Sequence, residues 1–323
     1  MNNKFNGKIY YLCFDNPQPT GGNKKAYRHV DLLNKNGFNA YVLHHTDGFR
    51  YTAFVNATKV AYLSAAKLGP EDFLVVPEDY GPNSSNLAPG IKKVIFNQNA
   101  YYSFAHYSIE KDNMTIPYRN KDYKAVIAVS EDNINYLAYA FPGLKIFRIH
   151  NSIDASIFSS NKNKQKAVCF MTRKHANEVQ QVINILKFRN SLGDFKLVPI
   201  ENKTEKEVAE IMKTSLIYLA FGYPEGCPLS IAEAMSCGCY VIGYHGFGGR
   251  ELMSPAFSTP VEAADIIHFA NSAEEIINIC NSSPQIIEEK GRQASDFIRA
   301  NYSPGREERD LIDIWSKILS LSD

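Results

Sequence analysis

The sequence contains little that would hold the protein in a membrane or in a disulfide framework. None of its apolar runs approaches the 18 or so residues that a membrane-spanning helix needs. The start of the chain is polar, and the short apolar run that follows is too short for the core of a signal peptide. The six cysteines form no CxxC pair, which excludes a zinc ribbon and a thioredoxin-like motif. We therefore expect a cytoplasmic protein with reduced cysteines, and a peripheral membrane contact stays open.

A strong charge of one sign is also missing. The 323 residues include 35 Lys and Arg and 34 Asp and Glu. This balance disfavours both a strongly basic nucleic-acid-binding protein and an acidic disordered chain. The charges are unevenly divided, because residues 1–154 carry 17 basic and 13 acidic side chains and residues 155–323 carry 18 and 21. The small positive excess of the first half suits an anionic partner, although an ordinary solvated surface would show the same excess.

Short apolar runs alternate with segments of helical periodicity along both halves of the chain. In the first half we expect strands at residues 8–14, 40–44, 72–77, 93–97, 125–130 and 145–150. In the second half we expect them at residues 167–171, 196–200, 216–220, 240–243 and 266–269. Strands that alternate with helices predict parallel sheets with helices on both faces. The polar stretch 154–166 interrupts the pattern and is expected to be a domain linker.

A pair of glycines lies where the first strand meets the first helix, in the segment Pro19-Thr20-Gly21-Gly22-Asn23. Paired glycines let a ligand approach the backbone, and a helix N-terminus offers free N–H groups. The segment is not GxGxxG, and no acidic residue ends the second strand, so we do not expect a nicotinamide dinucleotide site. A glycine turn needed only for tight geometry remains the alternative.

Residues 221–238 form the segment richest in chemistry. Glu225 lies in a Gly/Pro loop directly after an expected strand, and Pro228 suits the first turn of a helix that Gly238 ends. Glu233 falls about one and a half turns into that helix. The eight-residue spacing of the two glutamates is not evidence for a site, because about one such pair is expected by chance. The evidence is that one glutamate follows a strand and the other lies in the next helix. Carboxylates placed in this way can accept hydrogen bonds from sugar or ribose hydroxyls, and the helix N-terminus can hold a phosphate.

Two cations, Arg173 and Lys174, follow shortly after the first strand of the second half. The carboxyl ends of parallel strands meet at one edge, so we expect both near Glu225. Two cations beside a helix N-terminus can bind a diphosphate, and Arg can bind two oxygens at once. A solvated basic pair in a loop is the alternative. Residues 246–251 form another glycine-rich turn after a strand, and no Asp-x-Asp occurs that would chelate a metal.

Together these segments resemble the GT-B glycosyltransferases, in particular glycosyltransferase family 4. Gly21-Gly22 is similar to the N-terminal glycine loop of that family. Residues 150–154, His-Asn-Ser-Ile-Asp, are similar to its domain-junction segment, with Ser152 in place of the usual glycine. Glu225 and Glu233 match its E-x7-E motif, and the match continues to Gly238. The resemblance covers most of the chain.

The resemblance implies both a fold and a site. The expected fold is α/β of the GT-B type, in which two Rossmann-like domains face each other across a cleft. Glu225, Arg173 and Lys174 are the expected catalytic residues: Glu225 would contact the transferred sugar, and the two cations would neutralise the leaving diphosphate. Glu233 would bind the donor ribose. The other expected donor-binding residues are Gly22, Gly226, Cys227, Pro228, Leu229 and Ser230, of which Pro228 has no N–H to donate.

The chain departs from the family at two places. The family histidine near the donor sugar has no clear counterpart, and residues 96–102 occupy the expected place. The candidates for sugar or acceptor contacts in this region are Asn97, Asn99, Tyr101 and His106. A lone histidine in an aromatic stretch can equally be structural. The second departure is Glu178, which stands five residues after Arg173, where the family usually has its clamp lysine.

Two domains are expected, with residues 1–153 forming the acceptor domain and residues 154–302 the donor domain. Residues 303–323 contain a helix with one apolar face, and in GT-B enzymes the last helix returns to the first domain. A helix packed only on the second domain is the alternative.

The expected function is transfer of a sugar from a nucleotide-sugar donor to a hydroxyl group of a saccharide or lipid-linked glycan. The resemblance implies retention of configuration, with no metal and no other cofactor. A sugar-nucleotide epimerase and a transferase acting on DNA have the same fold and remain alternatives. A nucleic acid is the less expected partner, because the first half is only slightly basic. A non-catalytic sugar-binding relative is disfavoured, since Arg173, Glu225 and Glu233 are all present.

Overall fold

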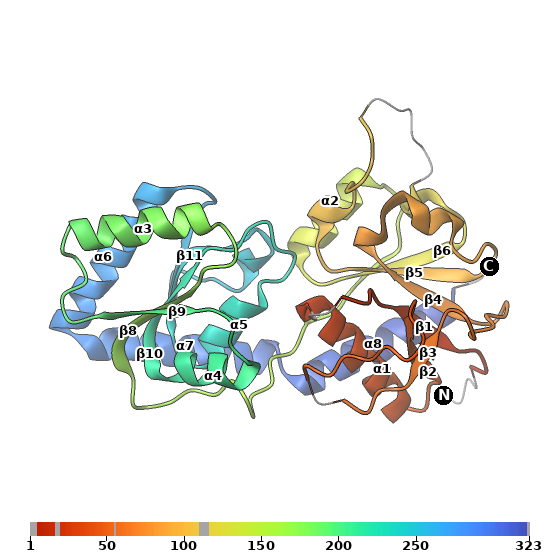
Figure 1. Cartoon of the computed structure of the whole chain (residues 1–323), viewed down its shortest axis with the longest axis horizontal. Coiled ribbons are helices and arrows are strands. Elements are labelled where there is room, and N and C mark those ends of the chain that lie inside the picture. Colours follow the sequence, from red (N-terminus) through yellow and green to blue (C-terminus); the bar gives the residue numbers. More distant parts are fainter. Residues whose placement is uncertain (1–4, 17–19, 55, 110–115, 322–323) are drawn as a thin grey trace. The chain divides into compact units, whose positions relative to one another are not determined.

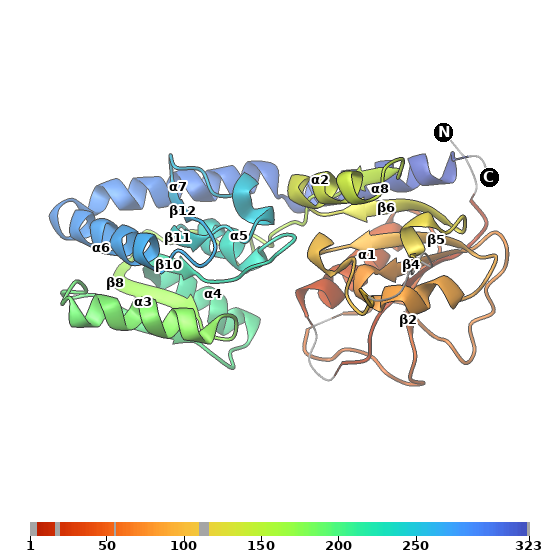
Figure 2. The same ribbon diagram turned by 90° about the horizontal axis from the view of Figure 1, so that it is seen from above.

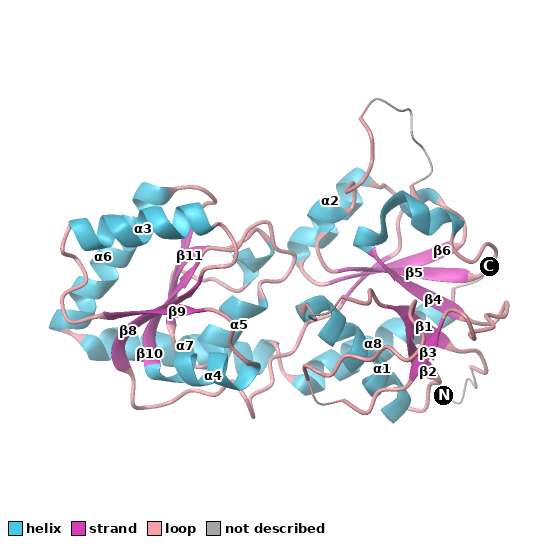
Figure 3. Cartoon of the chain, viewed as in Figure 1, coloured by secondary structure: helices cyan, strands magenta, loops and turns pink. Residues whose placement is uncertain are grey.

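The computed structural model describes residues 5–16, 20–54, 56–109 and 116–321. The chain divides into two compact units. Unit 1 comprises Met1–His150 and Glu307–Asp323, and unit 2 comprises Asn151–Arg306. Each unit has a central sheet with helices on its faces (Figures 1 and 3). The predicted α/β class is therefore confirmed.

Unit 1 is built on a seven-stranded sheet in the order β3-β2-β1-β4-β5-β6-β7, and its neighbouring strands are parallel. The strands are β1 (Ile9–Leu12), β2 (Ala40–His44), β3 (Val60–Tyr62), β4 (Phe73–Pro77), β5 (Lys92–Asn97), β6 (Tyr123–Ala128) and β7 (Ile146–Arg148). The sequence analysis did not predict β3, a strand of three residues. The strand order reverses between β1 and β4, where ligands of such sheets bind beyond the carboxyl ends.

Helices cover both faces of this sheet because successive side chains of each strand point to opposite sides. Phe96 of β5 contacts His29 of α1 (Gly21–Lys35), with ring centroids 4.7 Å apart. The preceding residue, Ile95, packs in a cluster with Leu137 of α2 (Glu131–Ala140). Short 3-10 turns complete the α2 side, namely η1 (Glu78–Asn86), η2 (Ala100–Tyr102) and η3 (Pro117–Arg119).

The last helix, α8 (Pro304–Leu319), is drawn in dark blue in Figure 2 and contacts α1 and β1 of unit 1. Its Glu307 is fully buried and accepts hydrogen bonds from Lys25 at 2.9 Å and from Arg28. The indole N–H of Trp315 donates to the hydroxyl of Tyr11 at 3.2 Å. The predicted return of this helix to the first domain is therefore confirmed, and the alternative of packing only on the second domain is wrong.

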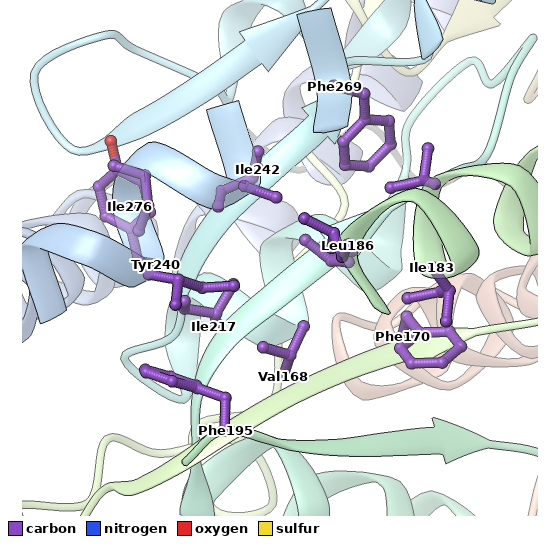
Figure 4. Packing of buried hydrophobic residues seen from close by; sticks show 14 of the residues in the cluster. Val168, Phe170, Ile183, Leu186, Phe195, Ile217, Tyr240, Ile242, Phe269 and Ile276 are labelled. Carbon is purple, nitrogen blue, oxygen red and sulfur yellow. The ribbon is translucent and has the colours of Figure 1, made fainter. Parts of the chain in front are cut away.

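Unit 2 has a five-stranded parallel sheet in the order β12-β11-β10-β8-β9. The strands are β8 (Gln165–Met171), β9 (Lys196–Ile200), β10 (Ser215–Ala220), β11 (Tyr240–Tyr244) and β12 (Ser258–Val261). The helices are α3 (Ala176–Phe188), α4 (Glu205–Thr214), α5 (Leu229–Ser236), α6 (Ile266–Ser282) and α7 (Pro284–Asn301), with the 3-10 turn η4 (Gly248–Glu251). Helices α3 and α6 bury one face of the sheet, around Val168, Leu186 and Ile242 (Figure 4). Helices α4, α5 and α7 bury the other face.

The expected strand at residues 266–269 is wrong, because these residues form the first turn of α6. The side chain of Asp265 accepts from the N–H of His268 and caps the helix. Phe269, Ala273 and Ile277 are buried at helical spacing along one face. A four-residue segment with three apolar residues cannot distinguish a strand from a buried helix turn. The strand of this region is β12, which begins eight residues earlier in the chain.

The polar stretch 154–166 is not a free linker, because it packs on unit 2. Ile153 and Phe158 are buried in the core around α5. The ammonium group of Lys164 donates to the carbonyl oxygens of Met212, Ser215 and Cys237 at 2.7–3.0 Å. The unit boundary therefore lies at residue 150 and not within the polar stretch.

None of the helices in the described ranges combines the length and apolar character that a membrane crossing requires.

Candidate active site

The candidate site is built from three loops at the carboxyl edge of the unit 2 sheet. They follow the adjacent strands β8, β10 and β11 and contain residues 172–175, 221–228 and 245–249. Parallel strands bring these loops to the same edge, which is where ligands of such sheets bind. The sequence placed Arg173, Lys174 and Glu225 in two of them.

The glycine-rich third loop fixes the backbone of Glu225. Glu225 and Phe247 form a parallel β-bridge, in which the N–H of Glu225 donates to the carbonyl of Gly246 at 2.8 Å. The N–H of Gly248 donates to the carbonyl of Glu225 at 3.0 Å. A Cβ on Gly248 would lie 1.9 Å from the carbonyl oxygen of Gly226, so only glycine allows this close approach. The function of this third loop is therefore to hold the second.

The structure brings Lys174 and Glu225 together as an ion pair. Their side chains are 37% and 23% exposed, so both are accessible from solvent. Arg173 directly precedes Lys174 in the same loop, and its side chain is exposed. Two cations and a carboxylate, predicted from separate segments, therefore lie at one edge.

Helix α5 begins at this edge and carries the second carboxylate. Pro228 precedes its first residue, and no side chain caps the helix there. Leu229, Ser230 and Glu233 are half-buried, in the first two turns. Tyr218 of β10 is fully buried beneath them, where burial raises its pKa and the carboxylates of Glu233 and Glu225 add to the effect.

This arrangement can bind a sugar diphosphate. Ionised carboxylates accept hydrogen bonds from sugar hydroxyls. Exposed cations and an uncapped helix N-terminus attract the oxygens of a diphosphate. Nowhere in the described residues do three or more His, Cys, Asp or Glu side chains gather as a group that could hold a metal ion.

In unit 1 the glycine pair forms the start of α1. Side chains of the first turn of α1 already accept hydrogen bonds from backbone N–H groups at this N-terminus. Thr20 and Asn23 cap each other, so the N–H of Asn23 already has an acceptor. A Cβ on Gly22 would lie 2.8 Å from the side-chain amide of Gln98, which would have to move to make room for it. Pro19 lies outside the described residues.

Asn97, one of the candidates for a sugar contact, lies inside unit 1. Its side chain is fully buried and donates to the hydroxyls of Ser103 and Tyr118 at 3.1 and 2.8 Å. Its amide oxygen accepts from Asn133 at 3.0 Å. The amide therefore joins β5 to α2 inside the unit.

The other candidates of unit 1 lie in the segment that follows β5. Asn99 is buried, and its side chain accepts from the N–H of Tyr101. The hydroxyl of Tyr101 donates to Asp132 at 3.0 Å. His106 is exposed and has a left-handed backbone, with φ at 69°. Tyr101 and His106 stay predicted acceptor contacts.

Sequence reasoning missed a buried carboxyl group at the carboxyl end of β4. The side chain of Glu78 accepts from the N–H of Asn99 at 2.7 Å. Burial, together with neighbouring Asp79, raises the pKa of Glu78 to about 8. Glu78 directly follows an expected strand, so the rule that selected Arg173 could have found it.

Three further residues of unit 2 were also missed. His175, Glu178 and Tyr223 contact one another beside the Lys174–Glu225 pair. The sequence gives no sign that His175 contacts Tyr223, because these residues belong to two loops and lie 48 positions apart in the chain.

Comparison with known proteins shows similarity to glycosyltransferases. No family model matches the chain. An alpha-1,6-glucosyltransferase of Actinobacillus pleuropneumoniae serotype 7 is 24% identical over 260 residues, which cover 76% of this chain and 75% of that protein.

Two solved structures share the fold over almost the whole chain. Sucrose-phosphate synthase from Thermosynechococcus elongatus superposes with a TM-score of 0.73 at 12% identity, covering 98% of this chain and all of the other. The Anabaena protein HepE in complex with UDP-glucose gives a TM-score of 0.71 at 14% identity, covering 96% and 99%. The predicted resemblance to GT-B glycosyltransferases, and with it the predicted fold class, is confirmed.

Proposed function

We propose that this GT-B protein is a glycosyltransferase that uses UDP-glucose as its donor. The acceptor is a hydroxyl group of a saccharide or of a lipid-linked glycan. The similarity to an alpha-1,6-glucosyltransferase supports the reaction, and the UDP-glucose complex of the HepE structure supports the donor.

The observation that carries this proposal is the contact of Lys174 with Glu225 beside the N-terminus of α5. Cleavage of a sugar–phosphate bond develops negative charge on the departing diphosphate. Fixed cations and a helix N-terminus stabilise that charge more in the transition state than in the bound donor, and this difference accelerates the reaction.

Each residue of the site has a role in this proposal. Arg173 and Lys174 bind the diphosphate, together with backbone N–H groups at the start of α5. Glu225 accepts hydrogen bonds from the transferred glucose, and Glu233 accepts them from the ribose. The positive charge comes from side chains, so the proposed reaction needs no metal. An α-linked product from an α-linked donor corresponds to retention of configuration.

A thermal-shift panel of UDP, UDP-glucose, ADP-glucose and GDP-mannose tests the donor. A ligand that binds only the folded protein stabilises it by about 2.7 kcal/mol at a hundredfold excess over Kd. We expect this stabilisation with UDP and UDP-glucose, and a uniform response to the four compounds would contradict the proposal.

Product analysis separates transfer from the alternatives. A transferase consumes UDP-glucose when an acceptor saccharide is present, whereas an epimerase changes the sugar of UDP-glucose without an acceptor. We expect UDP release to depend on the acceptor and to persist in EDTA. Loss of activity in EDTA would overturn the metal-independent mechanism.

A further inference from the structure

A pair of stacked rings joins the two loops that carry the proposed catalytic residues. The imidazole of His175 lies parallel to the ring of Tyr223, with centroids 3.9 Å apart and an interplanar angle of 6°. His175 directly follows Lys174, and Tyr223 stands two residues before Glu225. The rings therefore join the same two loops as the Lys174–Glu225 ion pair.

Hydrogen bonds fix the orientation of the imidazole. Its Nε2 lies 2.6 Å from the carbonyl oxygen of Tyr223, and a carbonyl only accepts, so Nε2 carries the hydrogen. Nδ1 faces the carboxylate of Glu178 at 3.5 Å. The backbone of His175 is left-handed, with φ 52° and ψ 46°, which histidine adopts more readily than most residues.

Glu178 completes the arrangement from the first turn of α3. The hydroxyl of Tyr223 donates to its Oε1 at 2.7 Å, and this carboxylate is the main reason that the pKa of Tyr223 rises to about 12. The side chain of Glu178 is only 17% exposed. Its carboxylate is thus directed at Tyr223 and His175.

Packing holds the tyrosine on its remaining sides. The ring of Tyr223 meets the ring of Tyr244 edge-on, with centroids 5.3 Å apart and planes at 89°. Burial and the carboxylate of Glu178 raise the pKa of Tyr244. These contacts hold the side chain of Tyr223 in place. Because Glu225 stands two residues later in the same loop, they also restrain the backbone of Glu225.

We infer that His175, Glu178 and Tyr223 are positioning residues that hold Glu225 against Lys174. The inference rests on the proposed function and extends it. Position 178, where the resemblance would place a diphosphate-binding lysine, here supports the loop of the sugar-binding carboxylate. In this proposal, Arg173 and Lys174 are the side chains whose positive charges bind the diphosphate.

The mildest tests are Tyr223→Phe, which removes only the hydroxyl, and Glu178→Gln, which removes only the charge. We expect kcat for glucosyl transfer to fall about tenfold in each, because small displacements of reacting groups are costly. The Kd for UDP, measured by calorimetry, should stay within about twofold of wild type, since neither residue touches the diphosphate. His175→Asn, which tolerates the left-handed backbone, should behave in the same way.

Tyr240→Phe is the matched control. Tyr240 is a buried tyrosine of unit 2, and its hydroxyl hydrogen-bonds to Thr259 at 2.9 Å. We expect wild-type kcat from this variant. Equal kcat values for Tyr223→Phe, Glu178→Gln and Tyr240→Phe would overturn the inference.

Glu178→Lys distinguishes support from diphosphate binding. If residue 178 faced the diphosphate, the lysine would tighten UDP binding and raise transfer. We expect instead a loss of transfer at least as large as in Glu178→Gln, with no gain in UDP affinity, and tighter UDP binding would overturn the inference. A wild-type protein that binds no UDP would refute the proposed function itself, a result separate from all of these.

Discussion

Among single residues, Glu78 shows how the fold changes the chemistry of a side chain. It follows β4 and is 92% removed from solvent, since its exposed fraction is 8%. Burial raises its pKa to about 8, against a usual value of 4.5. Between these two values the folded protein binds a proton that the unfolded chain releases. This group therefore favours the folded state fully below about pH 4.5, and its contribution is lost as the pH rises to about 8.

The Glu78→Gln variant should remove this pH dependence. An amide oxygen can still accept from the N–H of Asn99, and no charge is buried at high pH. We expect the Tm of wild type to fall more than that of the variant between pH 5.5 and 8.5. Each kcal/mol corresponds to about 2–4 °C in a protein of this size. Thermal unfolding across the pH range checks this, with Glu71→Gln as the exposed control; parallel curves would contradict it.

The sequence could identify residues whose role depends on their place after a strand. Arg173, Lys174 and Glu225 were found in this way, and the structure places them at one edge. It could not show that Asn97 is buried, because the hydrogen-bonding groups that satisfy its amide come from η3 and α2. Nor could it show the contact of His175 with Tyr223, which depends on a left-handed backbone.

Among the elements, the glycine-rich turn after β11 has the most direct consequence for the site. A Cβ at position 248 would collide with the backbone of Gly226 and push the two loops apart. We expect Gly248→Ala to destabilise the protein by about 1–3 kcal/mol and to impair glucosyl transfer.

Gly69→Ala is the control for this substitution, because its Cβ would meet only Asp72 at 3.8 Å. Denaturant unfolding and transfer assays compare the two variants. If Gly248→Ala were as stable and active as Gly69→Ala, the supporting role of the turn would be wrong.

The packing of α8 on α1 depends on a buried charge. Glu307 is fully buried between Lys25 and Arg28, whereas neighbouring Glu308 pairs with the exposed Lys35. Removal of one partner of a buried pair costs about 3–5 kcal/mol, but an exposed pair contributes about 0–1 kcal/mol.

Glu307→Gln should therefore lower stability far more than Glu308→Gln. Denaturant unfolding measures the difference, and faster proteolysis within residues 307–321 would show that α8 separates first. Equal stabilities of the two variants would mean that the apolar face of α8, and not Glu307, holds the helix.

Element type was predictable where the apolar pattern was long. The strands β1, β2, β4, β5 and β6 were all expected from apolar runs. The first turn of α6 was misread because three of its four residues are apolar, and so short a segment shows no helical period.

At the scale of the whole molecule, the two units have the same architecture. Each has a parallel sheet with helices on both faces and with loops at the carboxyl edge. Composition predicted two such domains. It predicted a boundary between residues 153 and 154 and a linker at 154–166, whereas the unit boundary follows His150. Phe158 and Lys164 attach the polar stretch to unit 2, and Ile153, just before it, is buried there too. Two buried side chains and the hydrogen bonds of Lys164 thus outweigh the polar composition of the segment.

The central claim is that the carboxyl edge of the unit 2 sheet binds the donor diphosphate. Calorimetric titration of UDP-glucose into wild type, Arg173→Ala and Arg189→Ala tests it most directly. Arg189 lies at the far end of α3, where it pairs with Glu274 at 2.8 Å. Loss of a charge-assisted hydrogen bond costs about 1.5–3 kcal/mol, so Arg173→Ala should weaken binding by at least about tenfold. Arg189→Ala should bind as wild type does. Wild-type affinity in a folded Arg173→Ala protein would contradict the claim.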